Sequence, residues 1–171
     1  MQEIYLAGGC FWGAQSYLRN IKGVAETQVG FANGRTQEPT YYQVCHDGTG
    51  HAETVKVIYD EKNVPLRALL RLFFRIIDPT SLNKQGGDVG TQYRTGIYYT
   101  DEEAGRIARD ELHRLAEGLD RPVVVECLPL MGFWPAEEYH QDYLIKNPAG
   151  YCHVPLREIM EVKDLDPRSV L

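Results

Sequence analysis

The sequence has no long hydrophobic run and no surplus of basic residues. No stretch of about 18 apolar residues occurs, so no segment is expected to cross a membrane as a helix. Lys and Arg number 18 against 24 Asp and Glu, which gives a formal net charge of -6. No basic stripe is present that could neutralise phosphates. We therefore expect neither a membrane nor a nucleic acid as the partner.

Cysteines are few, and no two of them have the C-x-x-C spacing. The four are Cys10, Cys45, Cys127 and Cys152, and no paired His and Cys residues have the spacing of a zinc site. The first residues carry Glu3, no Lys or Arg and no long apolar segment, so no secretory signal is expected. The expected location is the reducing cytoplasm, where a disulfide usually has a catalytic role. We expect no metal and no organic cofactor.

The hydrophobic pattern predicts a single domain over residues 1–171, in which residues 153–171 are a C-terminal tail without a strong pattern. Residues 83–90 are polar and glycine-rich and are expected to form a loop. Thr100, with Glu103 three residues later, predicts the N-terminal cap of a helix. The predicted strands are 3–7, 24–31, 51–59, 95–99 and 123–128, and the predicted helices are 11–21, 65–77, 100–118 and 135–146.

The order of these elements favours an α+β fold. Strands and helices alternate, except that strands 24–31 and 51–59 are expected to follow one another without a helix between them. This order favours a two-layer α/β sandwich over a doubly wound parallel sheet. We expect a ferredoxin-like core with additions.

Cys10 stands where a glycine turn meets a predicted helix. Gly8 and Gly9 end the first strand, and the helix begins at the next residue. The N-terminus of a helix offers unpaired N–H groups and about half a positive charge, which lower the pKa of a thiol. Phe11 and Trp12 follow directly and are suited to an apolar pocket. We predict that Cys10 is a reactive nucleophile; the alternative is a small buried residue at a strand–helix junction.

Glu53 and Asp88 are the candidate acidic groups. Glu53 shares one face of a predicted strand with His51 and Val55. A carboxyl on an apolar face has a raised pKa, which suits a general acid. Asp88 lies among three glycines, in a loop that we expect close to a site. The alternatives are a salt-bridge partner at a sheet edge for Glu53 and an ordinary polar turn for Asp88.

Two hydroxyls and a second thiol complete the candidate site. Tyr41 and Tyr93 carry hydroxyls that can donate to a bound oxygen, although tyrosines more often serve in packing. Cys152 stands near the C-terminal end, from which its thiol could reach an oxidised nucleophile. Cys45 and Cys127 are expected to be structural.

Two other functions are compatible with a reactive cysteine. One is a non-catalytic module that binds oxidised peptides through aromatic side chains. The other is a cysteine hydrolase or acyltransferase with a histidine base, although no histidine lies in a recognisable hydrolase motif. The candidate bases are His51, His113, His140 and His153.

Several separate motifs resemble those of the A-type peptide methionine sulfoxide reductases, which reduce the S epimer of methionine sulfoxide. The resemblance runs from Tyr5 to His153, nearly the whole chain. Because several motifs occur in the family's order, the resemblance is specific. The motifs are Gly-Cys-Phe-Trp-Gly at 9–13, Val-Gly-Phe-Ala-Asn-Gly at 29–34, Pro-Thr-Tyr at 39–41, Gly-His-Ala-Glu at 50–53, and segments 73–81, 88–94 and 150–152.

The resemblance implies how the substrate is held and activated. Glu53 would protonate the sulfoxide oxygen, while Tyr41 and Tyr93 would hydrogen-bond it. Asp88 would help to fix the site. Phe11 and Trp12 would hold the substrate methyl group, and Tyr151 is placed with them among the substrate-binding residues.

The resemblance also implies a two-cysteine relay. Cys10 would be oxidised to a sulfenic acid, and Cys152 would resolve it as a disulfide that thioredoxin reduces. Cys152 is the last cysteine of the chain, whereas many relatives carry a further one. Gln15 stands where the family commonly has Glu, and Gly87 where Asn is frequent; neither is a catalytic position. We expect a monomer that repairs oxidised proteins.

Overall fold

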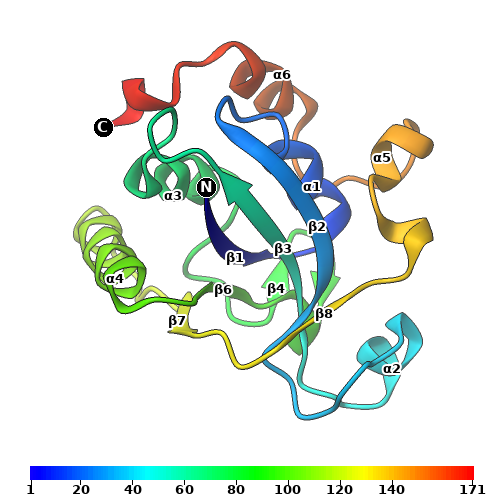
Figure 1. Cartoon of the computed structure of the whole chain (residues 1–171). Coiled ribbons are helices and arrows are strands. Elements are labelled where there is room, and N and C mark those ends of the chain that lie inside the picture. The colour runs from blue at the N-terminus through cyan, green and yellow to red at the C-terminus, as the bar shows by residue number, and fades with distance from the viewer.

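The computed structural model describes residues 1–171 as a mixed α/β fold around one six-stranded sheet (Figure 1). Its strands are β1 (Gln2–Gly8), β2 (Val24–Ala32), β3 (Ala52–Tyr59), β6 (Thr95–Tyr99), β7 (Glu126–Pro129) and β8 (Phe133–Pro135). They lie in the order β7-β6-β1-β3-β2-β8. Neighbouring strands are antiparallel, except that β6 and β7 are parallel. β1, an inner strand of this sheet, ends at Gly8, two residues before Cys10.

Helical segments follow or connect these strands. The α-helices are α1 (Phe11–Leu18), α2 (Tyr41–His46), α3 (Leu66–Phe74), α4 (Glu102–Glu117), α5 (Tyr143–Lys146) and α6 (Leu156–Asp164). Three short 3-10 helices are η1 (Thr91–Tyr93), η2 (Glu138–His140) and η3 (Pro167–Val170). The predicted strands at 3–7, 24–31, 51–59 and 95–99 are confirmed. The helices predicted from 11, 65 and 100 are also present, and they begin at Phe11, Leu66 and Glu102.

Alternation along the strands gives the sheet two unequal faces. Ile4 and Leu6 of β1 belong to the large core, which also includes side chains of α1, α3 and α4. Tyr5 and Ala7 belong to a smaller cluster on the opposite face. Phe133 covers that cluster, and its ring centroid lies 5.1 Å from that of Tyr5. In Figure 1 the yellow segment that carries Phe133 runs across the lower part of the sheet.

The predicted helix at 135–146 is wrong. These residues continue from β8 into η2 and then into the short α5. The free edge of β2 competes for their backbone, because the Ala136 N–H donates to the Val29 carbonyl at 3.0 Å. Asp142 has a left-handed φ of 51°, which separates η2 from α5. A sheet edge that lies distant in sequence therefore overrides the local periodicity.

The prediction that β2 and β3 follow one another without a helix is also wrong. α2 lies between them and has only one buried residue, Val44, so it has little apolar periodicity. Its signal is a capping box: the Thr40 side chain accepts from the Gln43 N–H, and the Gln43 side chain accepts from the Thr40 N–H. The cap fixes the position of Tyr41, the first residue of this helix.

Two further expectations about polar segments need correction. Residues 83–90 contain a small hairpin of β4 (Lys84–Gln85) and β5 (Asp88–Val89) rather than only a loop. The cap of α4 is Asp101 and not Thr100, because the Asp101 side chain accepts from the Ala104 N–H at 2.9 Å. The helix therefore begins one residue later than the Thr100–Glu103 pattern predicts.

The C-terminal residues are not a loose tail. α6 places Ile159 and Val162 in the main core, with exposed fractions of 7% and 2%. η3 packs beside α3, where the Arg71 guanidinium donates to the Val170 carbonyl at 3.0 Å. The expectation of a patternless tail at 153–171 is therefore wrong. Apolar residues at 156, 159, 160 and 162 have a helical spacing that could have predicted α6 from the sequence.

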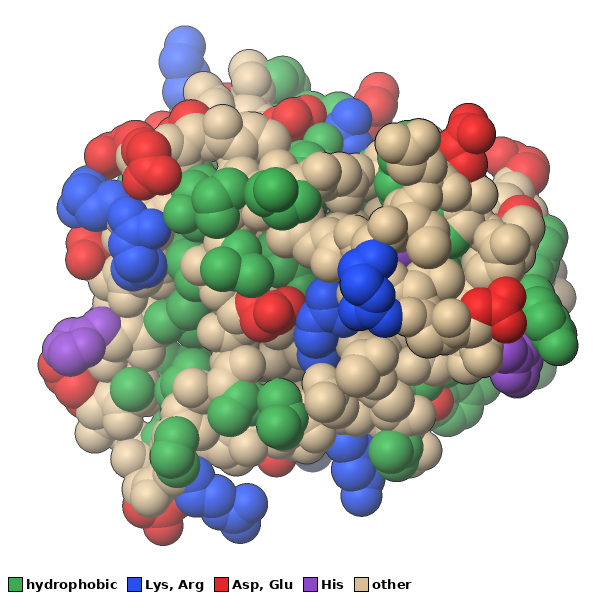
Figure 2. Space-filling view, turned by 90° about the horizontal axis from the view of Figure 1, so that it is seen from below, with side chains coloured by type: hydrophobic (Ala, Val, Ile, Leu, Met, Phe, Trp, Pro, Cys, Tyr) green, Lys and Arg blue, Asp and Glu red, His purple; other side chains and the backbone are tan.

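The surface carries charges of both signs. Figure 2, which shows the molecule from below, has Lys and Arg side chains in small groups among acidic ones and scattered apolar ones. None of the helices combines the length and the apolar character that a transmembrane span needs.

Candidate active site

Cys10 is the N-cap residue of α1 and lies where β1 ends. Gly9 makes this turn with a φ of 82°, a region that residues with a Cβ rarely enter. Hydrogen bonds from the N–H groups of Trp12 and Gly13 lower the pKa of the thiol, as its place at a helix start predicts. Burial and the charge of Glu53 nevertheless raise this pKa well above its ordinary value. The expectation of a lowered pKa is therefore wrong.

Glu53 lies on β3 and is only 1% exposed. Its Oε1 accepts a hydrogen bond from the Phe11 N–H at 3.1 Å, while Oε2 is buried without a partner. The pKa of Glu53 is raised to about 8: burial is the main cause, the Phe11 N–H acts against it, and the charge of Asp88 adds to it. At pH 7 the carboxyl is therefore largely protonated. The structure thus places a neutral acid directly behind the first turn of α1.

Two tyrosine hydroxyls face the same acid from separate elements. Tyr41 begins α2, and Tyr93 ends η1. Burial raises the pKa of both hydroxyls, and the charge of Glu53 is the next cause in each case. The charges of Asp88 and Cys10 also raise the pKa of Tyr93. Both hydroxyls therefore keep their protons near neutral pH and can donate hydrogen bonds.

The β4–β5 hairpin brings Asp88 to this cluster. Its Oδ2 accepts a hydrogen bond from the Tyr151 hydroxyl at 2.8 Å. Burial, followed by this bond, raises the pKa of Tyr151 to about 12, and the charges of Cys10 and Cys152 contribute. Residues from the hairpin and from the C-terminal part of the chain thus meet at Cys10.

Cys152 lies beside the first turn of α1. A Cβ built on Gly13 would come within 3.2 Å of its Sγ, so the helix surface and the thiol are in close contact. The thiol donates to the Val154 carbonyl at 3.3 Å, and all four cysteines are free. Burial raises its pKa. Cys152 also lines a groove of about 630 Å³ between α1, α5 and α6.

Comparisons with known proteins show the family of this chain. A family model described as "Peptide methionine sulfoxide reductase" matches residues 2–166. The chain belongs to the A-type peptide methionine sulfoxide reductases. A curated relative named "Peptide methionine sulfoxide reductase MsrA", from Lachnoclostridium phytofermentans, is 57% identical over 153 residues, which cover 90% of this chain and 92% of the relative.

Solved structures show the same likeness in three dimensions. The reduced form of Mxr1 from Saccharomyces cerevisiae is 37% identical, with a TM-score of 0.84 and coverage of 88% of both chains. Mxr1 has also been solved in complex with Trx2; that structure is 24% identical, has a TM-score of 0.60 and covers 83% of this chain and 84% of that one. The second likeness supports the fold alone.

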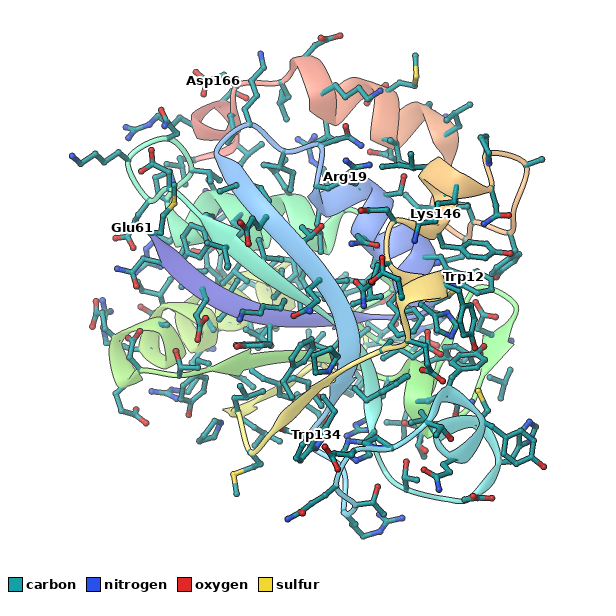
Figure 3. All side chains as sticks on the ribbon, turned by 45° about the vertical axis from the view of Figure 1, so that its right-hand side comes forward. Trp12, Arg19, Glu61, Trp134, Lys146 and Asp166 are labelled. Atoms are coloured by element: carbon teal, nitrogen blue, oxygen red, sulfur yellow. The ribbon has the colours of Figure 1, made fainter.

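In this member of the family, Trp12 has two aromatic partners that the sequence did not predict, Tyr143 and His140. The Trp12 ring stacks on Tyr143, with centroids 3.8 Å apart and planes at 11°. Its Nε1–H donates to Nδ1 of His140 at 3.0 Å. Figure 3 shows Trp12 next to the segment that carries Lys146. A continuous helix at 135–146 does not predict these contacts. In the structure, His140 lies in η2 and Tyr143 in α5, and both contact the Trp12 ring.

The histidines do not form a hydrolase site in this reductase-family chain. None of the four candidates has a hydrogen bond to Cys10. His51 accepts from the Gly34 N–H and contacts the Thr36 carbonyl, His113 lies near Glu117 on the surface, His140 accepts from Trp12, and His153 contacts the Gly8 carbonyl.

The other two cysteines lie in different surroundings. Cys45 is on α2 close to Tyr41; burial raises the pKa of its thiol and the Tyr41 hydroxyl lowers it. Cys127 is on β7, where its Sγ lies 3.9 Å from the Gly105 carbonyl of α4. A structural role for Cys45 and Cys127 stays a prediction, although Cys45 lies nearer to the site than its sequence context suggested.

Proposed function

We propose that the protein reduces the S epimer of methionine sulfoxide, free or within proteins, to methionine. The observation that carries this proposal is a protonated Glu53 next to the thiol of Cys10. A sulfoxide sulfur is a poor electrophile until its oxygen is protonated. Glu53 Oε2, which has no other partner, supplies that proton. Tyr41 and Tyr93 stabilise the polarised oxygen by hydrogen bonds.

The first step transfers an oxygen atom from the sulfur of methionine sulfoxide to the sulfur of Cys10. The Cys10 sulfur attacks the sulfoxide sulfur, and the oxygen passes to Cys10 as methionine leaves. Cys10 is oxidised by two electrons to a sulfenic acid, and the substrate sulfur is reduced by two. Glu53 gives a proton to the oxygen, and the thiol proton restores Glu53. The site therefore keeps its total charge, which matters because both groups are buried.

The substrate methyl group is held by the aromatic residues beside the thiol. Phe11 is only 1% exposed and packs against Phe31 and Tyr41. Trp12 supplies the accessible apolar surface, and Phe11 supports it from the core. Asp88 fixes the hydroxyl of Tyr151, which closes the other side of the substrate site.

The second half of the cycle regenerates the thiol. Cys152 condenses with the Cys10 sulfenic acid to form a disulfide and water. A thioredoxin dithiol, with a potential of about −270 mV, then reduces the disulfide by thiol–disulfide exchange. Yeast Mxr1, whose reduced form is 37% identical to this chain, has been solved in complex with Trx2, which supports thioredoxin as the reductant here.

The decisive experiment couples thioredoxin and its reductase to NADPH oxidation with S- or R-methionine sulfoxide. We expect turnover with the S epimer alone, no methionine from Cys10→Ser, and one methionine per enzyme without thioredoxin turnover from Cys152→Ser. Cys127→Ser is the matched control and keeps full turnover. Methionine formation by Cys10→Ser would remove Cys10 as the nucleophile, and continued turnover by Cys152→Ser would assign resolution to another cysteine.

We further propose that residues 1–171 form a single domain with a ferredoxin-like core. The antiparallel order β6-β1-β3-β2, with α1 and α3 as the connecting helices, supports this description. The free thiols are compatible with a monomer in the reducing cytoplasm that repairs oxidised proteins and uses neither nucleic acid nor membrane as a partner.

A further inference from the structure

The imidazole of His153 lies in a slot formed by glycines from three separate segments: Gly9, Gly13 and Gly86. A Cβ built on Gly9 would lie 3.1 Å from Nε2, and one on Gly13 would lie 3.0 Å from Nδ1. A Cβ on Gly86 would lie 3.7 Å from the His153 Cβ, at ordinary contact distance. The first two separations are tight for carbon against a ring nitrogen. The absence of side chains at Gly9 and Gly13 thus makes room for the ring.

One hydrogen bond fixes the orientation of this ring. Nε2 of His153 lies 3.0 Å from the Gly8 carbonyl oxygen. A carbonyl only accepts, so Nε2 carries the hydrogen and Nδ1 has the lone pair. Nδ1 is buried without a partner. The ring is therefore attached to the backbone just two residues before Cys10.

The same placement holds the neighbouring thiol against α1. Cys152 Sγ and His153 Nδ1 both lie next to Gly13, in the first turn after Cys10. No side chain binds the Cys152 thiol; its contact is the Val154 carbonyl at 3.3 Å. On the other side, Tyr151 is bonded to Asp88 but is 48% exposed. The more enclosed anchor of this segment is thus His153.

We infer that His153 is a positioning residue that holds Cys152 within reach of oxidised Cys10. This inference rests on the proposed function and concerns its second half. In that step the Cys152 sulfur attacks the sulfur of the Cys10 sulfenic acid, the S–S bond forms and the S–O bond breaks. The hydroxyl leaves as water with the proton of the Cys152 thiol, so no further oxidant is needed. A fixed position raises the rate of this intramolecular step.

The test separates the two halves of the cycle in a single turnover. Excess S-methionine sulfoxide is mixed with reduced enzyme, and the methionine released and the Cys10–Cys152 disulfide formed are measured by quenching, alkylation and mass spectrometry. His153→Leu fills the slot but cannot donate to Gly8. We expect it to keep the burst of one methionine and to form the disulfide about tenfold more slowly, the effect of one hydrogen bond of about 1.4 kcal/mol.

Rescue and a second variant distinguish positioning from general disruption. His153→Gln can place an amide N–H near the Gly8 carbonyl, so we expect it to restore most of the rate of disulfide formation. Gly13→Ala keeps His153 but crowds both Sγ and Nδ1, so we expect it to slow disulfide formation more than methionine release. Far-UV circular dichroism and thermal unfolding check that each variant is folded.

His113→Leu, on the exposed face of α4, is the matched control and leaves both rates unchanged. Wild-type rates of disulfide formation in His153→Leu and Gly13→Ala would overturn the inference and leave the proposed function intact. Equal slowing of methionine release and disulfide formation in His153→Leu would also overturn it, because the residue would then serve the whole site. A wild-type enzyme that releases no methionine would instead refute the proposed function.

Discussion

Burial acts on the thiol of Cys10 and on the carboxyl of Glu53 in the same direction, because it disfavours the charged form of each. Both groups therefore hold their protons at neutral pH, and the charge of ionised Glu53 raises the pKa of Cys10. A low thiol pKa is thus not the source of the proposed reactivity of Cys10. We expect the proton of Glu53 to move onto the sulfoxide oxygen as the sulfur of Cys10 attacks.

The rate of methionine release is expected to fall as the pH rises through about 8. The pKa of Glu53 is raised by burial to about 8, so the acid is present below this pH and is lost above it. Quench-flow single turnovers of Cys152→Ser, from about pH 6 to about pH 9.5, measure this profile. In the same background Glu53→Gln should lower the rate about 10²–10⁴-fold and remove the decline. A rate that rises through pH 8 would indicate thiol ionisation instead.

At the scale of elements, two glutamine amides hold an edge segment, residues 136–146, against the sheet. β8 pairs with β2 over only three residue pairs, so the rest of this edge of β2 lacks a strand partner. The Gln141 side chain accepts from the Val29 N–H at 3.0 Å and donates to the Val29 carbonyl at 2.9 Å. Buried Gln15 donates to the Thr27 hydroxyl and accepts from the Asp142 N–H. The edge segment in turn carries the groups that pack on Trp12.

Gln141→Leu should loosen the edge segment and weaken substrate binding. The change leaves the Val29 N–H without a partner, which costs about 1–3 kcal/mol of the free energy of unfolding, while the Val29 carbonyl keeps only its bond from the Ala136 N–H. Because the Trp12 stack depends on this segment, we expect KM for methionine sulfoxide to rise more than kcat falls. Urea denaturation and steady-state kinetics measure the two effects. Exposed Gln28 of the same strand provides the control, Gln28→Ala, and an equal loss in both variants would contradict the role of the amide.

At the scale of the whole molecule, histidines whose pKa values are lowered by burial make the free energy of unfolding depend on pH. Burial lowers the pKa of His51, His140 and His153 below the ordinary value of about 6.5. Between the folded and unfolded pKa values the unfolded chain binds more protons, so the free energy of unfolding decreases as the pH falls. The side chain of His51 also accepts from the Gly34 N–H, a bond that protonation removes.

We therefore expect the free energy of unfolding to decline as the pH falls below about 6.5. Urea denaturation from about pH 7.5 to about pH 5 measures the decline. His51→Gln, whose amide oxygen can still accept a hydrogen bond, should flatten part of this dependence, whereas exposed His113→Gln should leave it unchanged. A profile that is the same in wild type and His51→Gln would show that His51 does not contribute.

Much of the fold could be predicted where local pattern and tertiary environment agree. Strand alternation placed Glu53 on the face of Val55 and Val57, and both valines lie in the main core. The expected helix start after Gly9 is also confirmed. The hydrophobic pattern gave a wrong prediction at 135–146, where the backbone hydrogen-bonds to the edge of β2. It also missed α2, which is marked by an N-terminal capping box and not by apolar periodicity.

The candidate site, like the fold, could be predicted only in part from the sequence. The sequence singled out Cys10, Glu53 and Cys152 because their local contexts and motifs are distinctive. It did not reveal that His140 bonds Trp12, or that His153 lies between glycines from three segments. Those contacts join residues more than sixty positions apart, and a single sequence carries no local mark of such pairs.

The sequence by itself determined the family and the positions of four main strands along the chain, and it singled out Cys10 as the candidate nucleophile, because motifs and hydrophobic periods are properties of neighbouring residues. Only the tertiary structure decided the protonation of the site. Burial of Cys10 and Glu53 behind α1 reverses the expected effect of the helix terminus on the thiol. Only the tertiary structure also decided where Cys152 lies, because its position depends on how His153 fits among distant glycines. Desolvation and shape both arise from packing, which no local pattern contains.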